Sequence, residues 1–164
     1  MKEFLAKKYI SRILKYGLYM LVVLIFQTML LSGLRPLGVC PLFLPAAVVA
    51  VGMFEGATWG AVFGLIIGIF ADMAFVESTV AFTLLFPVIS FAVGFVSQFF
   101  LNKRFLPYMG VALVGLLVTA LAQMLRVLVR DGLSADMLET ALLQALWALP
   151  FAALAYIPPA RMAE

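Results

Sequence analysis

The sequence predicts an all-α integral membrane protein, a bundle of six transmembrane helices in one domain. The chain has 164 residues, of which 66% are hydrophobic and 12% charged, whereas a soluble domain is roughly 45–50% apolar and about 25% charged. Its mean hydropathy is +1.17. The chain is also too apolar for a membrane β-barrel, whose strands alternate polar and apolar residues.

The composition removes several kinds of chemistry. The chain has no histidine, which is the commonest general base and metal ligand. Its single cysteine, Cys40, excludes an intrachain disulfide and a thiolate metal cluster. The net charge of +3 is modest, and we expect no metal, no cofactor and no nucleic-acid partner.

The first fifteen residues are a basic segment ahead of a membrane domain, residues 16–164. The segment carries five basic residues: Lys2, Lys7, Lys8, Arg12 and Lys15. Apolar residues recur between them at helical spacing, so we expect an amphipathic helix on the inner leaflet. The alternative is a simple topogenic flank of the first span. The apolar run that follows is too long for a cleaved signal peptide.

Residues 16–34 are the first expected span, close to the roughly 20 residues that a bilayer requires. Gln27 lies inside it, and an amide buried in a membrane usually bonds to another helix. Arg35 and Pro36 follow, and the proline is expected to end the helix.

Residues 39–53 are short and contain two prolines, Pro41 and Pro45. They form either a short second span or a re-entrant hairpin. Six spans with an inner N-terminus place eight basic residues inside and three outside, whereas five spans place seven inside and four outside. Because basic residues favour the cytoplasmic side, we expect six spans, with both termini in the cytoplasm.

Glycine recurs at every fourth position around the start of the third expected span, residues 57–75, and the next step of four reaches Asp72. The glycines are Gly52, Gly56, Gly60, Gly64 and Gly68. Each costs a helix about 1 kcal/mol relative to alanine, but in a membrane this spacing forms a groove for another helix.

We expect two parts in this ladder. Gly52 and Gly56 shape an inner turn around Glu55, and the other three glycines line a helical groove that leads to Asp72. The groove receives either a helix of the same chain or a helix of a partner protein.

Residues 78–101 and 105–129 are the fourth and fifth expected spans. Gln123, Arg126 and Arg130 share one face at the outer end of the fifth, since helical neighbours recur at steps of three and four. Arg126 either extends to the lipid headgroups or pairs with Asp72, which six spans place at the same depth.

Residues 138–157 are the sixth expected span. Ser134 is expected to cap its helix, and Pro158 and Pro159 are expected to end it. Arg161 then marks the inner face.

Few residues could support catalysis. An active site needs a placed nucleophile, base or metal, and the glycine run lacks the Lys-Ser/Thr of a phosphate loop. We therefore expect a non-enzymatic protein. Two hypotheses remain: a structural protein that receives partner helices, and a small-molecule-binding subunit with its ligand near Asp72, Arg126 and Arg130.

The segment from Gly60 to Met73 resembles the signature of the rod shape-determining protein MreD family. That signature is a span with glycine at every fourth position that ends in aspartate, followed by a short polar turn and another span. Gln27, Pro41, Ser78-Thr79 and Pro150 also match, and the overall plan agrees over essentially the whole chain. One departure is Ala81, where the family usually has glycine.

The resemblance implies a membrane scaffold of the bacterial cell-elongation complex in the cytoplasmic membrane, without an activity of its own. Its expected partner is the single-span protein MreC, which connects it to a SEDS glycosyltransferase, a class B penicillin-binding protein and MreB filaments. The family fold is thought similar to the S-components of energy-coupling factor (ECF) transporters. The alternative function is therefore a transporter subunit, although residues 16–34 lack the Ala-x3-Ala motif usual in S-components.

Overall fold

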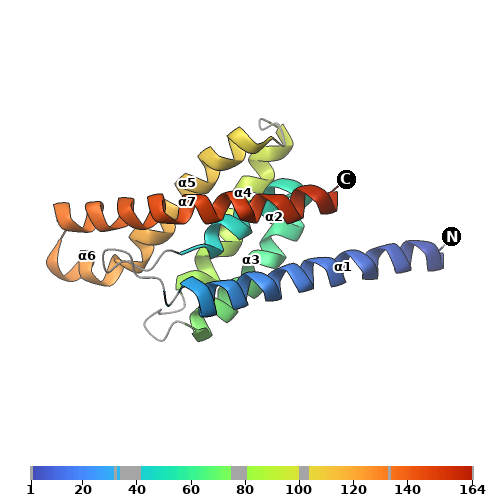
Figure 1. The fold of residues 1–164 in the computed structure, drawn as a ribbon, viewed down its shortest axis with the longest axis horizontal. Helices are drawn as coiled ribbons and strands as arrows, with labels where there is room; N and C mark the ends of the chain where they lie inside the picture. The colour runs from blue at the N-terminus through green and yellow to red at the C-terminus, as the bar shows by residue number, and fades with distance from the viewer. Residues whose placement is uncertain are drawn as a thin grey trace.

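The computed structural model describes residues 2–31, 33, 42–74, 81–99, 104–132 and 134–163 (Figure 1). All regular structure in these residues is helical. The elements in order are α1 (Lys2–Ile25), the π-helical turn η1 (Phe26–Leu31), α2 (Leu44–Glu55), α3 (Ala57–Ala74), α4 (Ala81–Phe99), α5 (Phe105–Gln123), α6 (Leu125–Asp131) and α7 (Ala135–Ala163).

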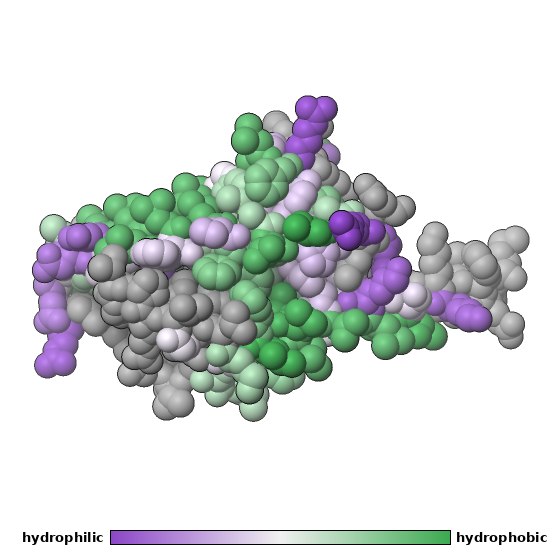
Figure 2. Space-filling view, viewed as in Figure 1, coloured by the Kyte–Doolittle hydropathy of each residue, from purple (hydrophilic) through white to green (hydrophobic). Residues whose placement is uncertain are grey.

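Five helical stretches are long and apolar enough to cross a membrane. They are Tyr9–Met29, Ala57–Ala74, Ala81–Phe99, Phe105–Gln123 and Ala135–Arg161. Hydrophilic residues gather toward the ends of the visible face, and hydrophobic residues lie between them (Figure 2). A bilayer solvates such exposed apolar surface, whereas water does not. The prediction of an α-helical membrane protein is confirmed.

α1 joins the basic N-terminal segment and the first span in one helix. The helix passes residues 15 and 16 without a break and reaches Ile25 before η1 continues it, and Figure 1 shows a straight rod. A basic segment lying flat on the leaflet needs a bend at this boundary. The basic residues instead extend along the axis of the span.

α2 is the centre of the bundle. Its residues from Leu44 to Phe54 are all buried, and it packs against α3, α4, α5 and α7. A helix that is apolar on every side is typical of such a position. Its 12 residues span only about 18 Å, well short of the roughly 30 Å hydrocarbon core. Residues 42–53 contain no hairpin, and residues 39–41 lie outside the described part of the chain.

The fifth span ends earlier than predicted. α5 stops at Gln123, and α6 begins at Leu125 after a turn at Met124. The Met124 amide donates to the carbonyls of Ala120 and Leu121, a tightening that often ends a helix. α6 leaves the axis of α5 (Figure 1). Gln123 therefore belongs to α5, whereas Arg126 and Arg130 belong to α6, so the three residues do not lie on one continuous helix as predicted.

The first turn of α7 agrees with the predicted cap, although the helix starts three residues before residue 138. The backbone N–H of Met137 donates to the Ser134 hydroxyl oxygen at 3.4 Å. This bond satisfies one of the N–H groups that have no partner within a first helical turn.

The other end of α7 contradicts the prediction that Pro158 and Pro159 stop the helix, because α7 continues to Ala163. Proline at position 159 leaves the carbonyl of Ala155 without its usual helical donor. The Tyr19 hydroxyl of α1 donates to that carbonyl at 3.0 Å. A distant residue thus satisfies the group that the proline leaves open.

A stripe of alanines forms the inner face of α7. Its members are all buried: Ala141, Ala145, Ala148, Ala152 and Ala155. Small side chains let helix backbones approach closely in membranes, and α7 uses this stripe against α2 and α5. Between these helices the Tyr108 hydroxyl lies 3.1 Å from the carbonyl of Ala46 and 2.8 Å from that of Ala152.

Candidate functional site

The glycine seam, Gly60, Gly64 and Gly68 of α3, is filled by α4 of the same chain. A Cβ added at Gly64 would lie 2.7 Å from the carbonyl oxygen of Phe86, and one added at Gly68 would lie 2.5 Å from that of Phe82. Such contacts are too short for a side chain, so only glycine fits. The seam therefore serves packing within the chain and leaves no room there for a partner helix.

The first two glycines of the ladder have different roles. Gly56 joins α2 to α3 with a φ of 89°, a conformation that favours glycine, so it forms the predicted corner. Gly52 does not belong to the turn, which corrects the prediction. It lies within α2 and faces α4, where an added Cβ would be 2.6 Å from the carbonyl oxygen of Ser90. Because α2 and α3 fold back on each other, Gly52 also meets Gly60.

Two serines of α4 strengthen this three-helix contact and were not singled out from the sequence. The Ser90 hydroxyl donates to the carbonyl of Val48 at 3.1 Å, and the Ser97 hydroxyl lies 3.3 Å from that of Met53. The seven-residue spacing of the serines, with Gly94 between them, is the signal that could have found them.

Asp72 holds the start of α4. Its carboxylate accepts hydrogen bonds from the backbone N–H of Phe82 at 3.2 Å and of Thr83 at 2.8 Å. It also accepts one from the Thr83 hydroxyl at 2.5 Å. A negative charge is favourable at a helix N-terminus, whose first N–H groups have no partner in the helix. Asp72 is thus a cap supplied by the preceding helix.

Gln27 performs the same task for α2. Its side chain is fully buried, and its Oε1 accepts a hydrogen bond from the backbone N–H of Phe43 at 2.7 Å. Phe43 directly precedes α2. The Gln27 amide thus bonds to the residue that precedes α2 and not to a residue inside another helix.

The polar residues predicted at the outer end of the fifth span are brought together only in part. The amide of Gln144 in α7 donates to Oε1 of Gln123 in α5 at 3.2 Å. Arg130 lies exposed in the last turn of α6. The side chain of Arg126 lies outside the described part of the chain, so its proposed pairing with Asp72 stays a prediction.

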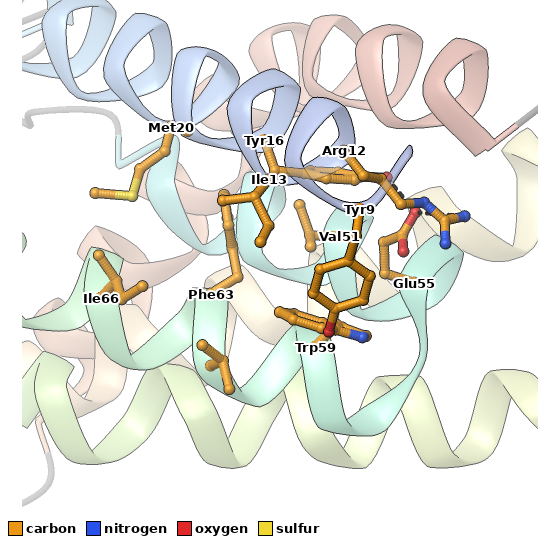
Figure 3. Close-up of a pocket in the computed structure, with 12 residues that line it drawn as sticks. Tyr9, Arg12, Ile13, Tyr16, Met20, Val51, Glu55, Trp59, Phe63 and Ile66 are labelled. Carbon is orange, nitrogen blue, oxygen red and sulfur yellow. Dashed lines mark hydrogen bonds and ion pairs between the residues drawn. The ribbon is translucent and has the colours of Figure 1, made fainter. Parts of the chain in front are cut away.

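A cavity of about 160 Å³ lies between α1 and α3, with part of α2 at its back. We call it the α1–α3 cavity (Figure 3). Its walls are mainly apolar, and Ile13, Met20, Phe63 and Ile66 line most of its length. This cavity could not be predicted, since a cavity between helices that are distant in the chain leaves no local sequence pattern.

A polar cluster closes one end of this cavity. The Tyr16 hydroxyl donates to Oε1 of Glu55 at 2.6 Å, and an Nη atom of Arg12 lies 3.5 Å from the same oxygen. The Glu55 side chain is only 7% exposed. Glu55 is predicted to lie in a turn, and no sequence pattern predicts this cluster, although Arg12 and Tyr16 are one helical turn apart.

Most of the buried polar side chains bond outside their own helix, as Gln27, Ser90, Ser97 and Gln144 do. The Thr119 hydroxyl instead donates to the Gly115 carbonyl within α5. No buried side-chain nitrogen or oxygen among the described residues is left without a hydrogen-bond partner. The residues that the structure covers also contain no group of three or more His, Cys, Asp or Glu that could hold a metal ion.

Fold and site together define an α-helical, multi-pass membrane protein whose interior polar groups fasten one helix to the next. Comparisons with protein-family models, with curated proteins and with solved structures found no match.

Proposed function

We propose that this protein is a non-enzymatic membrane scaffold of the bacterial cell-elongation complex, of the MreD type. The observation that carries the proposal is the use made of the segment from Gly60 to Asp72. Its glycines seat α4, and its aspartate holds the first turn of that helix. Because the residues of this segment pack helices together, the segment is consistent with a scaffold that maintains the arrangement of other membrane proteins.

The proposed topology has six passes in the bacterial cytoplasmic membrane, with both termini in the cytoplasm. The N- and C-termini lie at the same end of the bundle (Figure 1), which favours an even number of passes, with the short α2 as the second. In this topology eight of the eleven basic residues face the cytoplasm, in agreement with the positive-inside tendency.

The proposed partner is a single-span protein like MreC, which links the scaffold to a SEDS glycosyltransferase, a class B penicillin-binding protein and MreB filaments. Because α4 fills the glycine seam, the partner helix packs on the outer surface of the bundle. The exposed row Phe91, Phe95 and Phe99 on α4 offers large apolar side chains for that contact.

The experiment is depletion of the protein in the bacterium that encodes it, followed by re-expression of variants. Depletion should turn rods into wide or round cells, and the wild-type chain should restore them. Gly64→Leu should not restore rod shape, because its side chain meets the α4 backbone. Gly110→Leu is the matched control, since an added Cβ at Gly110 has no heavy atom within 4 Å. Rods that persist after depletion contradict the proposal.

The transporter alternative places a ligand near Asp72, Arg126 and Arg130. The Asp72 carboxylate is engaged with α4, and the α1–α3 cavity lies toward the opposite end of α3. No observation on the described residues favours a transported ligand at the predicted place.

A further inference from the structure

The α1–α3 cavity opens sideways toward the bilayer. Several of the side chains that line it, including Ile13, Val62 and Ile66, are also exposed on the outer surface. Its long axis follows α1 from Arg12 to Met20 (Figure 3), a distance of about 12 Å at 1.5 Å per residue.

The two ends of the cavity differ in polarity. Arg12 lies at one end, beside a pair of aromatic rings, Tyr9 and Trp59, whose centroids are 5.4 Å apart. Tyrosine and tryptophan are typical of the headgroup level of a membrane. The opposite end, near Met20 and Ile66, is apolar. The polar end therefore lies at the headgroups, and the apolar end reaches into the hydrocarbon.

Arg12 keeps hydrogen-bonding capacity for a ligand. Its contact with Glu55 involves one Nη atom at 3.5 Å, and 55% of its side chain is exposed. A guanidinium group carries five N–H donors and binds phosphate oxygens well. Glu55 places one negative charge beside Arg12. Residues 2–15, which include Arg12, contain five basic residues and one acidic residue.

We propose that the α1–α3 cavity binds an anionic phospholipid, with one acyl chain between α1 and α3 and its phosphate on Arg12. A cavity of about 160 Å³ is too small for a partner helix, which is about 10–12 Å wide with its side chains. Part of an acyl chain is slim enough for this cavity and can enter it laterally from the bilayer. This site is independent of the proposed role in cell elongation.

Brominated lipids, which quench tryptophan fluorescence on contact, test the proposal. The chain has two tryptophans, Trp59 at the cavity and Trp147 on α7, and each is 42% exposed. Trp147→Phe isolates the reporter at the cavity, and Trp59→Phe isolates a matched reporter away from it. The purified full-length variants are reconstituted with brominated phosphatidylglycerol or brominated phosphatidylcholine.

Trp59 should be half-quenched at a roughly fivefold lower mole fraction of the anionic lipid, and Trp147 should show no preference. Arg12→Gln should abolish the preference at Trp59, whereas Lys7→Gln, which removes a charge from α1 away from the cavity, should retain it. Gly17→Leu should also abolish it, because Gly17 lines the cavity and has open space at its Cβ. Gly110→Leu is its control.

Several results overturn the proposal. Equal quenching of Trp59 by both lipids does so, as does an equal loss in Lys7→Gln and Arg12→Gln, which indicates general surface attraction only. Displacement of the anionic lipid by excess inorganic phosphate points to a free-phosphate site instead. A Trp59 that neither lipid quenches shows that no acyl chain reaches the cavity.

Discussion

Asp72 at the end of α3 and Thr83 in the first turn of α4 are joined by two hydrogen bonds. The carboxylate accepts both the backbone N–H, at 2.8 Å, and the hydroxyl, at 2.5 Å. The aspartate that ends the glycine ladder thus acts on the helix that the ladder seats. The two features form a single device that sets the position of α4 along α3.

Asp72→Asn should weaken this device, because it removes the charge and turns an NH₂ group toward N–H donors. We expect a loss of about 1–2 kcal/mol in the free energy of unfolding, measured by denaturant titration in detergent. Asp136→Asn is the control at an exposed first turn and should cost about 0.3–1 kcal/mol or less. Equal losses in the two variants contradict the capping role.

Gly64→Ala should force α3 and α4 apart, because the new methyl group meets the backbone of Phe86 and Pro87. Overpacking of this kind costs about 1–3 kcal/mol. Gly110→Ala should instead stabilise the protein by up to about 1 kcal/mol, the difference in helix propensity. Thermal unfolding in one detergent compares the two, and a Gly64→Ala variant as stable as the wild type shows that the seam is loose.

Gln27→Leu should leave the buried N–H of Phe43 without the acceptor that it has at 2.7 Å. We expect a loss of about 1–3 kcal/mol and faster hydrogen exchange of the Phe43 amide, read by mass spectrometry. Thr28→Val is the neighbouring control, because the exposed Thr28 hydroxyl donates to the Leu24 carbonyl, one turn earlier, at 2.8 Å. Unchanged exchange at Phe43 argues against this cap.

The loss of unfolding free energy caused by Tyr19→Phe should depend on whether residue 159 is proline. In the wild type this change removes the donor to the Ala155 carbonyl and should cost about 1 kcal/mol. In a Pro159→Ala background the helix supplies its own N–H, so the same change should cost less. A double-mutant cycle on unfolding free energies should give a coupling of at least about 0.5 kcal/mol, and strict additivity rules out the compensation.

The long helices of the middle of the chain could be predicted because each follows a local rule. α3 was expected at residues 57–75 and ends at Ala74, and the Ser134 cap appears as expected. A serine that caps a helix bonds to a residue three positions away. An apolar run of membrane length is continuous in the sequence. These features therefore need no knowledge of the rest of the fold.

The errors share a different physical cause. Pro158 and Pro159 are read as a stop signal because the donor that compensates for proline, Tyr19, is 136 residues from Ala155, whose carbonyl it reaches. The central position of α2 could not be predicted from the sequence, because an apolar side chain in a membrane protein can face lipid or protein equally well. The cluster of Arg12, Tyr16 and Glu55 joins residues that only the folded bundle brings together.

The burial of α2 sets an order for biogenesis. A helix of 12 residues is too short to partition into a bilayer by itself, since its terminal backbone groups would remain unsatisfied in hydrocarbon. The neighbours that enclose it include α5 and α7, which leave the ribosome after it. The enclosure of α2 is therefore complete only once α7 is in place.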